Sequence, residues 1–318
     1  MKLINKKILT ITDGSQGMIS QVEGLSYHLS NKIKNYKTEV FFPWSRLQPG
    51  LLPVYKWIFK KKFDFKNKPD IIISCGRKSV YLSLLLKKIY KENIITIHIQ
   101  NPKVNIKNFD FIISPNHDRI TGSNVINSIG AIHHFRKENI EHCKIADKNI
   151  SNLNNLVSII IGGQNRHYKF TISIVQDLIK KILVLKNKYK NFNFLIIGSR
   201  RTDKKIIDLL NKKLGKENYV WNKKTENPYK FALKKSKFFI LTSDSTSMIS
   251  ECAFTGKPLY VYHLPFKRIS QRFVDFHNEF EKLNITKKFC GDLDNWGYKT
   301  LDEAKRISGI LLTRILNN

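Results

Sequence analysis

The sequence predicts an α/β protein made of two doubly wound domains that face one cleft. Three observations predict this fold. The chain has 318 residues, which is long for a single hydrophobic core. Short apolar segments alternate with segments of helical periodicity, and this alternation restarts near residue 155. Polar loops follow the predicted strands, whereas the loops before them are plain lysine- and asparagine-rich sequence.

The first half alternates short apolar runs with two amphipathic stretches. Apolar runs of this length, bounded by glycine, proline or asparagine, are typical of strands. The expected strands span 6–14, 38–44, 69–76, 93–102, 109–118 and 124–133. The expected helices span 21–33 and 79–90. Residues 138–155 are polar and rich in asparagine, so they are the best candidate for the connection between domains.

The second half repeats the pattern. Its expected strands span 155–163, 192–202, 219–222, 237–244 and 258–264. Its expected helices span 171–189, 204–215, 228–236 and 247–256. We therefore expect one domain over residues 1–150 and a second over 151–318, with the last helix able to pack back on the first domain. Ligands of such folds bind at the carboxyl ends of the strands.

Composition narrows the class of protein. No run approaches the roughly 20 apolar residues that span a bilayer, and the start of the chain leads directly into a first strand, so we expect a cytoplasmic protein. The net charge of +31 comes from lysines spread along the whole chain, which favours an anionic membrane surface over nucleic acid as a partner. The four scattered cysteines form no C-x-x-C pair, and no metal-binding spacing occurs. We expect no nucleic acid and no bound metal.

The segment "TSDSTSMISE" carries the densest polar pattern, where a strand passes into a helix. Small side chains allow the amide groups at a helix start to approach a phosphate, which the helix dipole favours. Glu251, one to two turns further on, is placed to accept hydrogen bonds from ribose hydroxyls. An ordinary capping box on a buried helix is an equally good interpretation. The candidate phosphate contacts are Asp244, Ser245, Thr246, Ser247 and Met248.

Three further loops of the second half are candidate donor contacts. "GGQNRHY" has glycines that permit close approach of backbone to a phosphate, although many strand-to-helix turns look like this. "GSRRT" places two guanidinium groups after a strand; a solvated basic turn is the alternative. "ENPY" precedes a helix. The candidates are Gly162, Gly163, Gln164, Asn165, Ser199, Arg200, Arg201, Glu226 and Asn227.

The first half supplies candidates for acid–base chemistry and for an acceptor. Asp13, after the first strand, could take a proton from an acceptor hydroxyl, or could be a simple Asp-Gly turn residue. His117 is the alternative base, and a loop-anchoring Asp-Arg pair is the plainer interpretation of its segment. Arg77 could anchor an anion or only begin a helix. The acceptor-side candidates are Gly14, Gln21, Arg77, Gln100 and Asp118.

Residues 43–63 interleave aromatic side chains with a lysine cluster. This composition suits the interface of an anionic membrane, and Trp57, Phe59, Lys60 and Lys61 are the candidate contacts. A buried loop and helix with a solvated lysine end is the alternative.

The polar blocks, in their order along the chain, resemble the family named after the plant "elongated mitochondria" fission factor. The resemblance rests on "TDGSQGMISQVEGL", "SCGRKSV", "HIQNP", "SPNHDRITGSNVINSIGAIH", "IGGQNRHYKF", "SRRT", "ENPY" and "TSDSTSMISECAFTGKP", which run almost from end to end. It implies a GT-B fold: two Rossmann-like domains, with an acceptor in the first and a nucleotide-sugar in the second. The last block is similar to the donor-binding helix of MurG-type and lipid A Kdo-type transferases, which implies Ser243–Ser247 at phosphate and Glu251 at ribose.

Two functions from different classes follow from this resemblance. The first is a metal-independent glycosyltransferase, with a nucleotide-sugar donor and a saccharide or lipid-linked acceptor of the cell envelope, acting peripherally at the inner membrane face. Asp13 or His117 would take the acceptor proton. The second is a non-catalytic scaffold of the same fold that recruits partners to a membrane. Charged residues at strand ends in both halves favour the enzyme, although fold analogy carries much of that preference.

Overall fold

The computed structural model describes residues 3, 5–64, 67–216 and 218–317. The chain divides into two compact units, Met1–His134 with Asp302–Asn318, and Phe135–Leu301. The first unit ends before residue 150 because the polar connection forms two short helices, α3 (Lys137–Glu141) and α4 (Lys148–Ser151), within the second unit.

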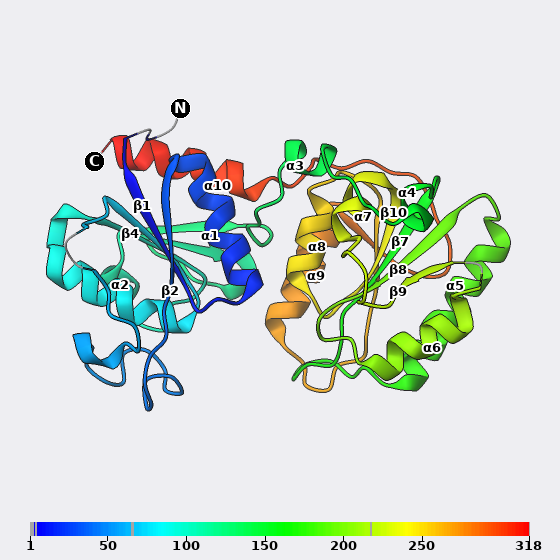
Figure 1. Cartoon of the computed structure of the whole chain (residues 1–318), viewed down its shortest axis with the longest axis horizontal. Helices are drawn as coiled ribbons and strands as arrows, with labels where there is room; N and C mark the ends of the chain where they lie inside the picture. The colour runs from blue at the N-terminus through cyan, green and yellow to red at the C-terminus, as the bar shows by residue number, and fades with distance from the viewer. Residues whose placement is uncertain (1–2, 4, 65–66, 217, 318) are drawn as a thin grey trace. The chain divides into compact units, whose positions relative to one another are not determined.

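The first unit is a six-stranded parallel sheet with helices on both faces (Figure 1). Its strands are β1 (Lys7–Thr12), β2 (Lys32–Lys37), β3 (Ile71–Cys75), β4 (Ile95–Ile99), β5 (Phe111–Pro115) and β6 (Val125–Ser128), in the spatial order β2-β1-β3-β4-β5-β6. Its helices are α1 (Gln16–Leu29), α2 (Arg77–Tyr90) and α10 (Glu303–Leu316). The order reverses between β1 and β3, so the loops after these two strands diverge and leave room for a ligand.

Alternation along the strands fixes which helix covers which face. Ile71 and Ile73 pack with α1 and α10, whereas Ile72 between them packs with α2. The last helix therefore belongs to the first unit, where α10 lies beside α1 (Figure 1).

One predicted strand of this unit is wrong. The strand expected at 38–44 is a loop, and the edge strand is β2, whose first two residues were expected to end the helix 21–33. An edge strand pairs on one side only, and β2 is polar and largely exposed, so its sequence carries no apolar signal. The apolar residues Val40 and Trp44 are buried instead as loop residues beneath the sheet's second face.

The second unit is also a six-stranded parallel sheet. Its strands are β7 (Leu156–Ile161), β8 (Asn193–Gly198), β9 (Tyr219–Trp221), β10 (Ser236–Thr242), β11 (Leu259–Tyr262) and β12 (Thr286–Lys288). Its longer helices are α5 (Ile172–Lys188), α6 (Lys204–Leu214), α7 (Tyr229–Lys235), α8 (Thr246–Ala253) and α9 (Gln271–Lys282). Helix α9 and strand β12 were not predicted from the sequence. Strand β12 is a three-residue edge strand that contains two lysines, so it carries no apolar signal.

The spatial order β12-β11-β10-β7-β8-β9 is that of Rossmann folds. One face of the sheet packs on α5 and α6 through residues such as Val157, Leu178 and Leu210. Helix α8 contacts β10 and β11 and buries Ile249 and Cys252. The sheet order reverses between β7 and β10, which makes the carboxyl ends of these two strands the expected ligand site.

Candidate functional site

The loops after β7, β8 and β10 meet at the carboxyl edge of the second sheet, around the side chain of Asp244. This carboxylate is buried. Its Oδ2 accepts a hydrogen bond from the Gly163 amide at 3.1 Å and lies 2.7 Å from Arg201 Nη2. Its Oδ1 accepts a hydrogen bond from the Thr242 hydroxyl at 2.7 Å. Asp244 therefore ties three loops from three strands into one rigid assembly.

Two glycines make this assembly possible. A Cβ on Gly162 would lie 2.1 Å from both carboxylate oxygens of Asp244, and a Cβ on Gly163 would lie 2.2 Å from the Arg201 carbonyl oxygen. The Gly162 amide also donates to Thr242 Oγ1 at 2.8 Å. The glycines predicted to approach a phosphate thus approach a carboxylate and a backbone carbonyl of their own unit.

We expect Gly162→Ala to lower the free energy of unfolding by about 2 kcal/mol or more, because the new methyl group displaces the buried Asp244 carboxylate from its partners. Urea unfolding measures this change. Gly297→Ala is the matched control: a Cβ there meets nothing within 4 Å, so its effect should stay within about 0.5 kcal/mol. Equal stability of the two variants would contradict the assembly.

The two adjacent arginines after β8 have different surroundings. Arg201 pairs with Asp244, and its Nη1 also points to the Gly163 carbonyl oxygen at 3.5 Å. Arg200 is exposed, and Ser199 donates its amide to Ile161 O at 2.7 Å. From the sequence, both arginines were expected to contact an anion. The charge of Arg201 is already balanced inside the protein, so Arg200 is the one better placed to meet a ligand.

Helix α8 begins at the same edge. Ser245 is its N-cap, with the side chain accepting from the Met248 amide at 3.4 Å, and Asn165 Nδ2 donates to the Asp244 carbonyl oxygen at 3.4 Å. Thr246 and Ser247 occupy the first turn, where backbone amides have no partner within the helix. The segment is therefore a capped helix start at the edge where a ligand is expected; the capping and phosphate interpretations coexist.

Glu251, further along α8, is half-buried and joined to a residue that the sequence analysis did not select. Its Oε2 accepts a hydrogen bond from the Tyr229 hydroxyl at 2.6 Å. Burial raises the pKa of Glu251 to about 7, and the hydrogen bond from Tyr229 partly opposes this rise. Tyr229 is the last residue of the "ENPY" block, and a tyrosine at the start of a helix is the only sequence signal for it.

The two candidate residues of that block support local structure. Asn227 accepts from the Tyr229 amide at 3.0 Å and so begins α7, while exposed Glu226 accepts from the Ala146 amide at 3.3 Å. They place Tyr229, and through it Glu251. Gln164, in the loop after β7, is exposed.

In the first unit, Asp13 follows β1 directly, at the point where the strand order reverses. Its Oδ1 accepts from the Ser15 amide at 3.0 Å, which leads the chain into α1. Gly14 has φ +89°, a left-handed conformation that favours glycine. The turn uses one carboxylate oxygen of Asp13, so the turn and proton-transfer interpretations are compatible.

Gln21 and Gln100 come together at the same edge. Gln100 Nε2 donates to Gln21 Oε1 at 3.3 Å, and the buried Cys75 thiol lies 3.7 Å from that oxygen. Gln100 has φ +83°, which is unusual for a side chain with a Cβ. Such strain persists where surrounding contacts impose it, and it is often found at binding sites.

Three other first-unit candidates have different environments. The Arg77 guanidinium donates to the carbonyl oxygens of Ser45, Arg46 and Leu47, so it holds a loop. His117 is buried, with Nε2 3.9 Å from Asp118 Oδ1. A buried imidazole is poorly placed to meet a bulky acceptor, which leaves Asp13 as the better base.

The aromatic segment 43–63 divides into buried and exposed side chains. Phe59 is 9% exposed and belongs to the core of the first unit, so it cannot contact a membrane surface as the sequence analysis expected. Trp57 is 62% exposed and stacks on Tyr55. Phe42 and Leu51, which the sequence analysis did not select as contacts, are 72% and 65% exposed. Lys60 and Lys61 are also exposed.

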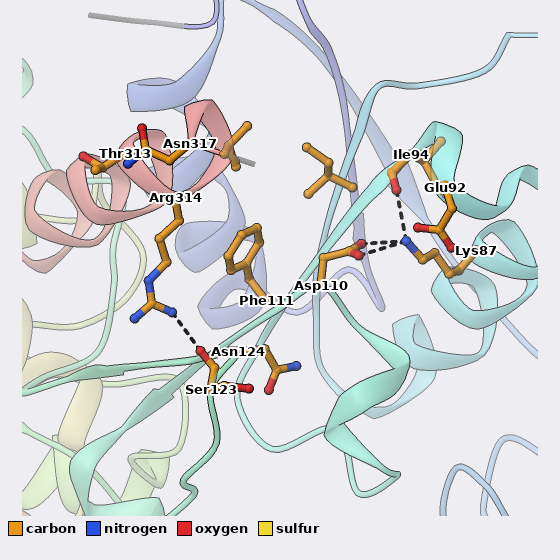
Figure 2. Close-up of a pocket in the computed structure, with 12 residues that line it drawn as sticks. Lys87, Glu92, Ile94, Asp110, Phe111, Ser123, Asn124, Thr313, Arg314 and Asn317 are labelled. Carbon is orange, nitrogen blue, oxygen red and sulfur yellow. Dashed lines mark hydrogen bonds and ion pairs between the residues drawn. The ribbon is translucent and has the colours of Figure 1, made fainter.

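A cavity of about 700 Å³ lies at the opposite, amino edge of the first sheet (Figure 2). Three of its charged side chains have partners: Lys87 Nζ lies 2.9 Å from both Asp110 oxygens, and Arg314 donates to the Ser123 carbonyl oxygen (Figure 2). The predicted site residues do not line it.

Among the residues that the structure describes, no group of three or more His, Cys, Asp or Glu side chains could hold a metal ion. Within the same part of the chain, no helix has both the length and the apolar character needed to cross a membrane.

These observations define the class of protein: a GT-B fold made of two α/β units, each with a parallel sheet. Solved structures with this fold match nearly the whole chain. A Listeria monocytogenes protein with the provisional name UDP-N-acetylglucosamine 2-epimerase is 11% identical, with a TM-score of 0.60 over 98% of each chain. The Staphylococcus aureus protein MnaA, in its co-structure with UDP, is 13% identical, with a TM-score of 0.52 over 96% of this chain and 88% of that one.

The chain belongs to the family described as Mitochondrial fission ELM1, whose pattern matches residues 16–315. The protein RP120 of Rickettsia prowazekii is 29% identical over 96% of this chain and 97% of its own length. The mitochondrial fission protein ELM1 of Arabidopsis thaliana is 25% identical over 75% of this chain, which spans 62% of the plant protein. The family resemblance found in the sequence is thereby confirmed, and so is the predicted fold class.

Proposed function

We propose that this protein is a glycosyltransferase that uses a nucleotide-sugar donor and no metal. The observation that carries the proposal is the reversal of strand order between β7 and β10. Helix α8 begins at this edge of the sheet and carries Glu251. The fold it shares with the UDP-bound S. aureus protein supports a nucleotide as the ligand by analogy.

The donor would bind along α8. The amides of Thr246 and Ser247 would donate to the diphosphate, whose charge the helix dipole and exposed Arg200 would stabilise as the sugar leaves. The Glu251 carboxylate would accept hydrogen bonds from the ribose hydroxyls, one turn further along the helix. Tyr229 holds that carboxylate in place at 2.6 Å.

A thermal-shift panel of UDP-, GDP-, ADP- and CMP-sugars tests donor binding. A ligand at 100 times its dissociation constant stabilises the folded state by about 2.7 kcal/mol, so one class of nucleotide should raise the melting temperature clearly. Glu251→Ala should remove that rise. No shift with any nucleotide would favour the second candidate, a non-catalytic scaffold.

The acceptor would be held by the first unit, and Asp13 would remove its hydroxyl proton. The Asp13 oxygen that does not accept from Ser15 is the one available for this step. Half-buried Gln100, whose Nε2 donates to Gln21 Oε1, offers its amide oxygen to a sugar hydroxyl. We propose a saccharide or a lipid-linked saccharide of the cell envelope as the acceptor.

The acceptor would lie at a membrane surface, which the exposed side chains of Phe42, Leu51 and Trp57 would contact. Phe42, Leu51 and Trp57 have the amphipathic or apolar character of interfacial residues, and Lys60 and Lys61 supply attraction to anionic headgroups. This surface also favours the scaffold, which needs membrane contact without catalysis.

We expect Phe42→Ser with Trp57→Ser to lower binding to vesicles of phosphatidylglycerol at least tenfold in flotation, without loss of thermal stability, because both side chains are exposed. Phe59→Ser should instead destabilise the protein by about 3 kcal/mol, because it removes a core side chain. Unchanged flotation of the double variant would contradict the membrane contact.

A further inference from the structure

A basic pocket lies in the second unit beside the proposed donor site. It has a volume of about 340 Å³ and is lined by Arg166, His167, Arg268, Ile269 and Ser270. The first two residues lie in the loop after β7, and the other three in the loop between β11 and α9. Both loops leave the carboxyl edge of the sheet. Among the described residues, no aspartate or glutamate lines this pocket.

The pKa of His167 reflects the positive charge of this pocket. Burial, followed by the positive charge of Arg166, lowers the pKa of His167; a hydrogen bond with the Arg268 backbone opposes this, and the charges of Arg268 and Arg272 add to it. Arg166 Nε donates to His167 Nε2 at 2.8 Å, so the proton of the neutral ring lies on Nδ1. That nitrogen is buried and makes no well-formed hydrogen bond. Among the described residues, the pocket therefore combines two arginine side chains and no acidic side chain with a buried donor that is incompletely satisfied, and both favour an anion.

The backbone reinforces this preference and connects the pocket to the donor site. Helix α9 begins immediately after Ser270, whose side chain caps none of its amides. The Asn165 side chain joins the two places: its Oδ1 accepts from the His167 and Tyr168 amides, and its Nδ2 donates to the Asp244 carbonyl oxygen. Residues 245–248 of the α8 start do not line the pocket, so it is a neighbouring site and not the same one.

We infer that this pocket is an oxyanion subsite, which binds a carboxylate or phosphate group in addition to the donor diphosphate. The inference deepens the proposed function, on which it rests, by naming the class of ligand: either the transferred sugar is acidic, or the acceptor is phosphorylated. Arg166 and Arg268 bind the anion, and His167 Nδ1 donates to it.

The test measures the pKa of His167 by NMR in the full chain, with inorganic phosphate, glucose 6-phosphate, UDP-glucose or UDP-glucuronate. An anion in the pocket stabilises the protonated imidazole, so the pKa should rise by about one unit or more. UDP-glucuronate should also bind about tenfold more tightly than UDP-glucose, which has a neutral hydroxymethyl group in place of the carboxylate. A rise with UDP-glucuronate identifies an acidic donor sugar, and a rise with glucose 6-phosphate alone identifies a phosphorylated acceptor.

The variant Arg166→Ala with Arg268→Ala should remove both effects while leaving UDP-glucose binding unchanged. Lys180→Ala with Lys212→Ala is the matched control, since it removes two exposed charges from α5 and α6. An unchanged His167 pKa with all four probes overturns the subsite. If no nucleotide binds but phosphate still raises the His167 pKa, the proposed function fails and the subsite stands.

Discussion

Arg201→Ala is expected to lower the free energy of unfolding by about 3 kcal/mol, whereas Arg200→Ala should change it by less than about 0.5 kcal/mol. Removing Arg201 leaves the buried Asp244 carboxylate without its charge partner, held only by the Gly163 amide and the Thr242 hydroxyl. The 40% exposure of the Arg201 side chain lets water compensate in part, which sets the estimate at the low end for a buried pair. Urea unfolding of both variants measures the difference.

In nucleotide-sugar binding, Arg200→Ala should have the larger effect of the two variants. Arg200 is exposed and close to the donor loops, so Arg200→Ala should weaken nucleotide-sugar binding about tenfold while the fold stays intact. Equal stability of the two variants, together with loss of binding in Arg201→Ala alone, would restore Arg201 as the ligand contact and contradict its structural role.

Asp13→Asn is expected to reduce turnover by a factor of about 10²–10⁴, the usual contribution of a positioned general base. Asparagine keeps the side-chain oxygen that accepts from the Ser15 amide, so the turn into α1 should persist. Thermal stabilisation by the donor should be unchanged, because Asp13 lies in the first unit and the donor residues lie in the second. Turnover with each donor of the panel is the measurement.

Asp70→Asn is a matched control for this change. Asp70 directly precedes β3 and accepts from the Lys7 amide at 2.7 Å, so it lies at the amino edge of the same sheet. Its replacement should cost stability and leave turnover per folded molecule unchanged. A fully active Asp13→Asn variant would exclude Asp13 as the base.

Much of the fold follows from sequence because the strands are buried on both faces. Segments such as 71–75 and 156–161 are continuous apolar runs, and their ends locate the loops at the carboxyl edge. The same logic fails for edge strands: β2 and β12 are polar, with only one neighbour each, and β12 has just three residues. The apolar run at 40–44 was therefore mistaken for a strand.

The candidate site was predictable as a set of loops and not as a set of contacts. Sequence order placed Asp244 and Arg201 at one edge, but their pairing joins residues far apart along the chain and depends on two glycines that allow the approach. The exposure of side chains could not be predicted either, since Trp57 and Phe59 are only two positions apart, yet Trp57 is exposed and Phe59 is buried. Arg166 lies within the "GGQNRHY" block and Arg268 lies outside every block, but neither was selected as a contact, because arginine and lysine are common along the whole chain.

The most direct test of the central claim measures how the affinity for the best nucleotide-sugar of the panel depends on pH, by calorimetry. Burial raises the pKa of Glu251 to about 7, and ribose hydroxyls donate to its deprotonated form, so binding should strengthen as pH rises through that value. The account predicts a dissociation constant about tenfold larger at pH 6 than at pH 8, and no such dependence in Glu251→Gln. Binding that is independent of pH and unaffected by that substitution, or no binding by any nucleotide-sugar, would contradict it.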